Sequence, residues 1–168
     1  MGTLLPTSKV AANLVAQEVL KVAKDSEGFV VELGSGTGRI TAALLKQGIH
    51  SDRLICVELD PELHKYMTGQ FPNLNIFLGD AAELKNILGK KFGKVAVIVS
   101  SLPMTLLPLE KRRKIELICF SSLKSGGIII QLCYSLKATF SSPFLSRELK
   151  DYIIMSLPPA FIWAYKKE

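Results

Sequence analysis

The chain has 168 residues, of which 48% are hydrophobic and 21% are charged. This length and composition predict one compact domain over 1–168, since no polar or Pro/Gly-rich linker divides the chain. The longest apolar runs, such as 126–130, are far shorter than the roughly 20 residues that cross a bilayer, so no transmembrane segment is expected.

The net charge of +6 favours anionic partners. Nucleic acid, anionic lipid headgroups and simple solubility all fit this charge. Three widely spaced cysteines, Cys56, Cys119 and Cys133, are typical of buried apolar side chains in a reducing cytosol, so neither a disulfide nor a metal site is expected. The first residues lack the basic segment and apolar core of a secretory signal, and a cytoplasmic location is predicted.

The first predicted helix begins where Thr7 and Ser8 can cap it and runs to about Lys24. It has a broad apolar side and a polar side that carries several lysines. We expect it to pack on a sheet beside the glycine-rich loop that follows. A helix that lies on a membrane, with its lysines toward lipid headgroups, is the alternative.

A strand, a tight turn and a helix start follow one another from Phe29 to Ile40. The strand carries Glu32, and the turn has glycines at every second position, which lets backbone amides approach a ligand closely. An acid two residues before the first glycine would repel a pyrophosphate but can pair with the ammonium group of an amino-acid-like ligand. The pattern therefore favours S-adenosylmethionine over a nicotinamide cofactor, with contacts from Glu32, Gly34, Ser35, Gly36, Thr37 and Gly38.

Two further strands end in acids. The strand from Arg53 ends in Glu58, where a carboxylate can accept both ribose hydroxyls of an adenosine. The strand 75–78 ends before Asp80, which is placed to reach the adenine amino group. Leu59 and Ala81, each next to one of these acids, and Ser100, after the fourth strand, complete the predicted cofactor contacts. A helix cap is the alternative role for each acid.

Strands and helices alternate along the chain, which predicts a doubly wound, Rossmann-like α/β fold with helices on both faces. We expect helices over 61–69 and 82–88, and a fourth strand over 94–99. Pro108 is expected at the first position of the next helix, and Gly126-Gly127 at its end. A fifth strand over 128–134 and an edge hairpin, 151–157 with 161–165, complete a seven-stranded, mostly parallel sheet whose last strand is antiparallel.

The fourth strand runs into Ser100, Ser101, Leu102, Pro103 and Met104. Pro103 fixes the backbone, so the carbonyls of the two serines could face an acceptor nitrogen. An ordinary strand-to-helix turn explains the segment equally well. The four cations at 111–114 surround the following helix and predict a solvated turn.

The stretch 135–150 is expected to be a long loop and places Phe140 and Phe144 among cations. Such a surface suits contact with an anionic membrane. The alternative is that both rings cap the sheet.

These residues carry a resemblance. The motif from Glu32 to Gly38, with Glu58 and Asp80 downstream, resembles class I S-adenosylmethionine-dependent methyltransferases, from about Ser8 to Tyr165. The segments 2–8, 101–104, 131–134 and 157–165 are similar to bacterial phospholipid N-methyltransferases, within the wider rRNA adenine dimethylase-like group.

The resemblance implies several expectations. Residues 1–28 would form a cofactor-covering segment and residues 29–168 the sheet core. The implied reaction is methylation of phosphatidylethanolamine, in one or more steps, by a peripheral protein at the inner face of an anionic membrane. The catalytic residues would be Ser101, Leu102, Pro103 and Tyr134, whose ring could attract the methylated cation.

Two other functions stay open. Enzymes that methylate amines of planar bases resemble each other in carrying Asn or Asp and an aromatic ring where this chain has Ser101 and Met104. That difference argues against nucleic acid as a partner but leaves an RNA adenine methyltransferase as one alternative. A non-catalytic protein that binds S-adenosylmethionine is the other.

Overall fold

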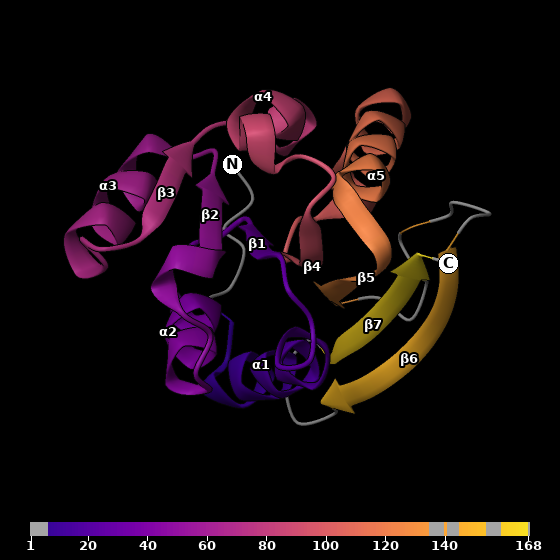
Figure 1. Ribbon diagram of the computed structural model, residues 1–168, viewed down its shortest axis with the longest axis horizontal. Helices are drawn as coiled ribbons and strands as arrows, with labels where there is room; N and C mark the ends of the chain where they lie inside the picture. Colours follow the sequence, from indigo (N-terminus) through magenta and orange to yellow (C-terminus); the bar gives the residue numbers. More distant parts are fainter. Residues whose placement is uncertain (1–6, 135–139, 141–144, 154–158, 168) are drawn as a thin grey trace.

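The computed structural model describes residues 7–134, 140, 145–153 and 159–167. One seven-stranded sheet forms its centre, in the order β3-β2-β1-β4-β5-β7-β6 (Figure 1). The strands are β1 (Phe29–Leu33), β2 (Leu54–Glu58), β3 (Asn75–Leu78), β4 (Val95–Ser100), β5 (Leu123–Cys133), β6 (Leu145–Ile153) and β7 (Ala160–Lys167). The first five strands pair in parallel, and β7 is antiparallel to both β5 and β6. The predicted fold class is confirmed.

Helices cover both faces of the sheet (Figure 1). They are α1 (Lys9–Ala23), α2 (Arg39–Lys46), α3 (Pro61–Gln70), α4 (Leu84–Leu88) and α5 (Leu109–Ser122), with short 3-10 turns η1 (Ser51–Arg53), η2 (Ala81–Glu83), η3 (Gly89–Lys91) and η4 (Met104–Leu106). One core cluster joins residues of α1, α2 and α3 to one face, and a second joins η2, α4 and α5 to the other. Because both faces are covered, β2 and β4 are buried along their whole length. Among the residues described, no helix combines the length and apolar character needed to span a bilayer.

The first helix packs on the sheet, as predicted. The Ser8 Oγ accepts a hydrogen bond from the Ala11 N–H at 3.1 Å and caps the helix. The buried face is made largely of small residues, which lets α1 lie close to α2 and the sheet: Ala11, Ala12, Val15, Ala16, Val19 and Ala23.

The expected end of the fifth helix is wrong. The helix ends at Ser122, and Gly126-Gly127 lie inside β5, where the pairing with β4 shifts register. A Cβ on Gly127 would come within 2.9 Å of the Lys124 carbonyl and 3.1 Å of the Val95 carbonyl. The glycines therefore permit an irregularity in a strand and do not cap a helix. Pro108 is the N-cap of α5, one position before the first helical position that was predicted for it.

The edge hairpin exists, but its first strand starts earlier than predicted. Leu145 already pairs with Lys167, within a stretch expected to be a loop. Phe140 is 2% exposed, and its ring lies 5.1 Å from that of Tyr165. Phe140 thus caps the sheet, which was the alternative interpretation, whereas Phe144 and residues 154–158 lie outside the described residues.

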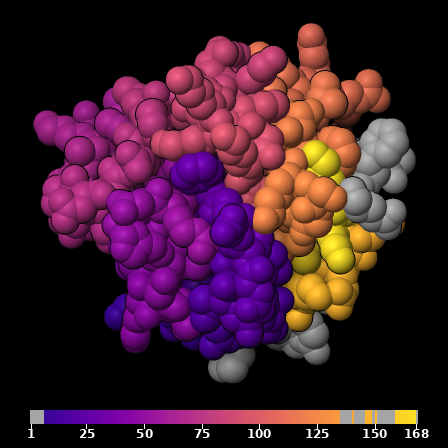
Figure 2. Space-filling model, viewed as in Figure 1, coloured from indigo at the N-terminus to yellow at the C-terminus, as the bar shows by residue number. Residues whose placement is uncertain are grey.

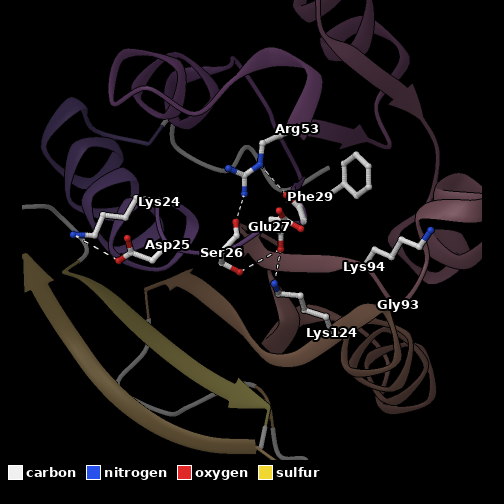
Figure 3. A pocket seen from close by; sticks show the side chains of 10 residues that line it. Lys24, Asp25, Ser26, Glu27, Phe29, Arg53, Gly93, Lys94 and Lys124 are labelled. Carbon is white, nitrogen blue, oxygen red and sulfur yellow. Dashed lines mark hydrogen bonds and ion pairs between the residues drawn. The ribbon is translucent and has the colours of Figure 1, made fainter.

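A cleft of about 830 Å³ lies at the amino ends of the strands, opposite the edge where the acids were predicted (Figure 3). Two cations that line this cleft, Arg53 and Lys124, donate hydrogen bonds to backbone carbonyls. The Arg53 guanidinium donates to the carbonyls of Ala23, Ser26 and Gly28, and Lys124 donates to that of Glu27. The cleft therefore anchors the segment between α1 and β1.

Candidate active site

The carboxyl ends of the parallel strands bring the predicted site residues to one edge of the sheet. Leu33 of β1 pairs with Val57 of β2 on one side and with Ser100 of β4 on the other. Glu58 pairs with Leu78 of β3, so Asp80 follows at the same edge. In doubly wound sheets this edge, beside the point where the strand order reverses, is where ligands bind.

The glycine loop is shaped by its neighbours and leaves space on one side. Gly34, Gly36 and Gly38 all have positive φ. A Cβ on Gly38 would lie 2.5 Å from the Met67 Sδ and 2.6 Å from the Phe71 ring, so the loop packs tightly on α3. A Cβ on Gly36 would meet nothing closer than the Gly34 carbonyl oxygen at 4.0 Å. The open side at Gly36 is where a ligand can approach the backbone.

Glu58 links the loop to the turn after β2. Its Oε2 accepts from the Gly36 N–H at 2.8 Å, and its Oε1 accepts from the N–H groups of Leu59 and Asp60 at 2.9 and 3.0 Å. An ionised carboxylate has about four acceptor positions, so one remains for a ligand hydroxyl. Leu59 beside it is 59% exposed and offers an apolar surface to a base.

Glu32 is 1% exposed and lies beneath the loop. Its Oε2 accepts from the Thr41 hydroxyl at 2.6 Å and from the Cys56 thiol at 3.7 Å, whereas its Oε1 is buried without a partner. Burial raises the pKa of Glu32 to about 7, with a further contribution from the charge of Glu58 and an opposing one from the Thr41 and Cys56 hydrogen bonds. A cationic ligand group at Oε1 would favour the ionised form.

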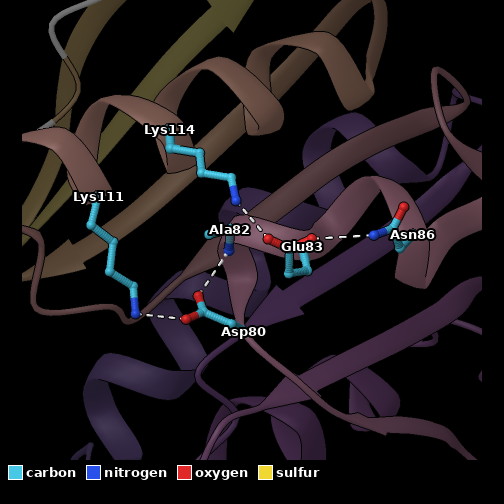
Figure 4. Close-up of polar contacts among 6 residues, drawn as sticks. All are labelled: Asp80, Ala82, Glu83, Asn86, Lys111 and Lys114. Carbon is cyan, nitrogen blue, oxygen red and sulfur yellow. Dashed lines mark hydrogen bonds and ion pairs between the residues drawn. The ribbon is translucent and has the colours of Figure 1, made fainter.

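Asp80 is engaged by the protein itself (Figure 4). Its Oδ1 accepts from the Ala82 N–H at 2.9 Å and its Oδ2 from the Lys111 ammonium at 2.6 Å. Partial burial raises the pKa of Asp80, but the Lys111 and Ala82 contacts outweigh burial and hold it below the usual range. Lys114 pairs with Glu83 in the same way. Thus two of the four cations at 111–114, expected to be solvated, tie α5 to the turn after β3.

The acceptor loop, defined here as Ser100–Met104, lies against the glycine loop. The Ser101 N–H donates to the Leu33 carbonyl at 3.1 Å, and a Cβ on Gly34 would lie 3.3 Å from the Leu102 side chain. The Ser101 Oγ is buried and has no partner. Tyr134 is half-buried beside the core cluster under α1, and burial raises its pKa.

Two residues that were not predicted to belong to the site also contact it. Thr41 supports Glu32, and Gln131 donates from its Nε2 to the Leu102 carbonyl at 3.0 Å. Each is a polar residue in an apolar run, and that contrast is the signal that could have identified them. Among the described residues no group of His, Cys, Asp and Glu could hold a metal ion.

The fold and this edge define a class: an α/β protein whose candidate site for a nucleoside-containing ligand lies between a glycine turn and strand-end acids. Residues 30–127 match the model of the methyltransferase domain family. The chain belongs to this family, which confirms the expectation of an S-adenosylmethionine-dependent methyltransferase domain.

Relatives agree with this assignment. An ornithine lipid N-methyltransferase of Singulisphaera acidiphila is 32% identical over 108 residues, which are 61% of this chain and 56% of that protein. The match thus spans little more than half of the relative. Among solved structures, an S-adenosylmethionine-dependent methyltransferase from Archaeoglobus fulgidus shares the fold at 14% identity with a TM-score of 0.68, covering 95% of each chain. An amino pentose methyltransferase from Micromonospora echinaspora has 17% identity and a TM-score of 0.63, covering 86% of this chain and 58% of its own.

The residues present fit the cofactor. The buried, unpartnered Glu32 Oε1 suits the ammonium of the methionine part, and the open side of Gly36 suits close approach to the loop. The remaining acceptor position of Glu58 suits a ribose hydroxyl. These individual contacts stay predictions.

Glu32 should make stability depend on pH. Its pKa in the folded protein, about 7, lies above the ordinary value of 4.5, so the folded state binds more protons between these pH values. Its contribution to the free energy of unfolding is therefore greatest below pH 4.5 and falls as pH rises to about 7, by about 3.5 kcal/mol at most at about 1.4 kcal/mol per pH unit. Urea unfolding without cofactor should show Glu32→Gln gaining stability relative to the wild type from pH 5 to pH 8. Glu110→Gln, an exposed carboxyl, controls for net charge, and an equal gain in both variants would refute the prediction.

Glu58→Ala should weaken cofactor binding about tenfold or more. The substitution removes a charge-assisted acceptor worth roughly 1.5 to 3 kcal/mol and also releases the Gly36 N–H. Isothermal titration calorimetry with S-adenosylmethionine measures the change. Asp60→Ala is the matched control, because Asp60 only caps α3 through the N–H groups of Glu62 and Leu63. Unchanged affinity in folded Glu58→Ala would remove Glu58 from the cofactor site.

Proposed function

We propose that this protein transfers methyl groups from S-adenosylmethionine to the amine of phosphatidylethanolamine and of its methylated products. The observation that carries the proposal is the surface directly after the acceptor loop. Leu106 is 76% exposed and Leu109 is 52% exposed. Apolar side chains beside cations favour a lipid interface with anionic headgroups.

The charges next to these leucines support the same acceptor. Lys111 and Lys114 are paired with Asp80 and Glu83, but neither Arg112 nor Arg113 has a carboxylate partner in the described part of the chain. Figure 2 shows the α5 region, coloured orange, projecting at the upper right of the molecule. Unpaired cations on a projecting element are available to lipid phosphates.

The acceptor loop is poorly suited to adenine. Stacking a base requires an exposed ring, whereas Met104 is 1% exposed and belongs to the core under α4 and α5. The lipid N-methylation named for the Singulisphaera relative supports an amine on a lipid as the acceptor here.

S-adenosylmethionine, when bound, supplies a methyl group on a sulfonium, so the C–S bond breaks as the amine forms its N–C bond, and sulfur keeps the bonding pair. The residues of the chain hold and orient the reactants, and good alignment accounts for much of the rate. The amine must arrive neutral, although its pKa in water lies near the lysine reference of about 10.4. Desolvation beside Leu102 and Pro103 favours the neutral form, and the product ammonium gives its proton to water. Tyr134 lies three residues beyond Gln131 on the same segment and can attract the methylated cation.

The first test is mass spectrometry of lipids after incubation with S-adenosylmethionine and vesicles of phosphatidylethanolamine and phosphatidylglycerol. We expect mono-, di- or trimethylated headgroups that disappear with Glu58→Ala. A second tube replaces phosphatidylethanolamine by ornithine lipid, and a third contains RNA. Methylated product from ornithine lipid alone would replace phosphatidylethanolamine by ornithine lipid as the acceptor. Methylated adenine would establish the RNA alternative. Cofactor binding without any methylated product would favour a non-catalytic protein that binds S-adenosylmethionine.

The exposed leucines should matter only at a membrane. Leu106→Gln combined with Leu109→Gln should lower methylation of vesicle lipid about tenfold or more at limiting lipid, since burying a leucine contributes about 1.5 to 3 kcal/mol. Activity on a soluble short-chain phosphatidylethanolamine should stay unchanged. Leu117→Gln is the matched control, because Leu117 is 67% exposed on α5 but lies about 12 Å from Leu109 along the helix. Equal losses on vesicles and on the soluble lipid would contradict a membrane role.

A further inference from the structure

Gln131 is an isolated polar residue in the buried, apolar half of β5. It follows three isoleucines in β5, and its side chain is 0% exposed. Burying an amide in such surroundings costs free energy unless its groups are hydrogen-bonded. The contacts of this side chain therefore indicate why an amide is present.

The donor side of the amide serves the acceptor loop. Its Nε2 donates to the Leu102 carbonyl at 3.0 Å and to the Leu132 carbonyl at 3.1 Å. The Leu102 carbonyl also accepts from the Met104 N–H at 2.8 Å, and the Leu102 N–H donates to the Ser100 Oγ at 3.4 Å. Both backbone groups of Leu102 are thus fixed, one of them by a strand that is 29 residues away in sequence.

The oxygen of the Gln131 amide makes no hydrogen bond in the folded protein. The Gln131 Oε1 is buried and has no partner, which is a cost to the stability of the fold. An unbranched apolar side chain of the same length would avoid this cost. The stability of the strand alone therefore does not account for glutamine at this position.

We propose that Gln131 is a positioning residue for methyl transfer, which holds the Leu102 peptide so that the acceptor loop presents its carbonyls to the amine. The inference rests on the proposed function and assigns a role in that site to β5. The loop has serine at position 101, with no amide of its own, and Gln131 brings one from the adjacent strand, where it pairs with Ser100.

The cross-strand partner of Gln131 provides a built-in probe. Trp163 is the single tryptophan of the chain and lies opposite Gln131 in the β5–β7 ladder. The Trp163 Nε1 is also buried without a partner. Its fluorescence emission should therefore respond to a change of side chain at 131.

The test compares Gln131→Met with Ile129→Met, a fully buried residue two positions earlier in the same strand and therefore on the same face of the sheet. Five quantities are measured: the urea unfolding midpoint, the affinity for S-adenosylmethionine, the kcat for the acceptor amine, hydrogen exchange in peptides over 100–107, and the fluorescence emission of Trp163. For Gln131→Met we expect an equal or higher midpoint, affinity within twofold, kcat lowered tenfold to a hundredfold, and faster exchange over 100–107. Ile129→Met should leave exchange and kcat near those of the wild type.

Gln131→Glu separates positioning from packing. Its ionised carboxylate cannot donate to the Leu102 carbonyl, whereas its protonated form can. The ratio of its kcat to that of the wild type should therefore rise as the pH falls. Parallel losses of stability, affinity and kcat in Gln131→Met, or a kcat ratio for Gln131→Glu that is independent of pH, would overturn the proposal.

The exchange measurement separates this inference from the proposed function. Absence of any methylated lipid from the wild type would refute the proposed acceptor, while faster exchange in Gln131→Met would still show that Gln131 holds the loop. Unchanged exchange over 100–107 would refute the role of Gln131 whatever the acceptor.

Discussion

The candidate site depends on the hydrogen bonds that the Glu58 carboxylate accepts from two loops. A buried carboxylate is tolerated only when its oxygens are hydrogen-bonded, and this one accepts from Gly36, Leu59 and Asp60. The first donor belongs to the glycine loop and the other two to the turn before α3. One side chain therefore fixes two loops relative to each other, and the open side of Gly36 keeps its shape without a ligand.

Other polar contacts extend this frame across the sheet edge. The Lys111–Asp80 and Lys114–Glu83 pairs join the start of α5 to the turn after β3, as Figure 4 shows. Exposed ion pairs stabilise a fold only slightly, so these partly exposed pairs supplement the packing of α5 against η2. Because α5 follows the acceptor loop, the loop is held at both ends: by Ser100 in the sheet and by α5 beyond η4.

Local patterns predicted the parts of the fold that depend on local chemistry. The strand Asn75–Leu78 was predicted with both of its bounds; Glu58 does end β2 and Asp80 does follow β3, while Glu32 lies one residue before the end of β1. The helix end predicted at Gly126-Gly127 was wrong. A glycine pair after a helix usually ends it, whereas here the chain already pairs with β4 as a strand from Leu123. The Gln131–Leu102 and Lys111–Asp80 contacts join residues about thirty positions apart, and no pattern within one element can reveal them.

The unpaired polar atoms of the fold have a common location. In the described part of the chain, the buried side-chain atoms without partners are Glu32 Oε1, Ser35 Oγ, Ser101 Oγ, Gln131 Oε1 and Trp163 Nε1. Glu32, Gln131 and Trp163 lie in rows that the register aligns across β1, β4, β5 and β7, whereas Ser101 directly follows β4 and Ser35 lies in the glycine loop. Each costs stability in the free protein, and natural cores contain few such atoms. Their concentration around the glycine and acceptor loops indicates that this edge has been shaped by what binds there, at the expense of the stability of the empty fold.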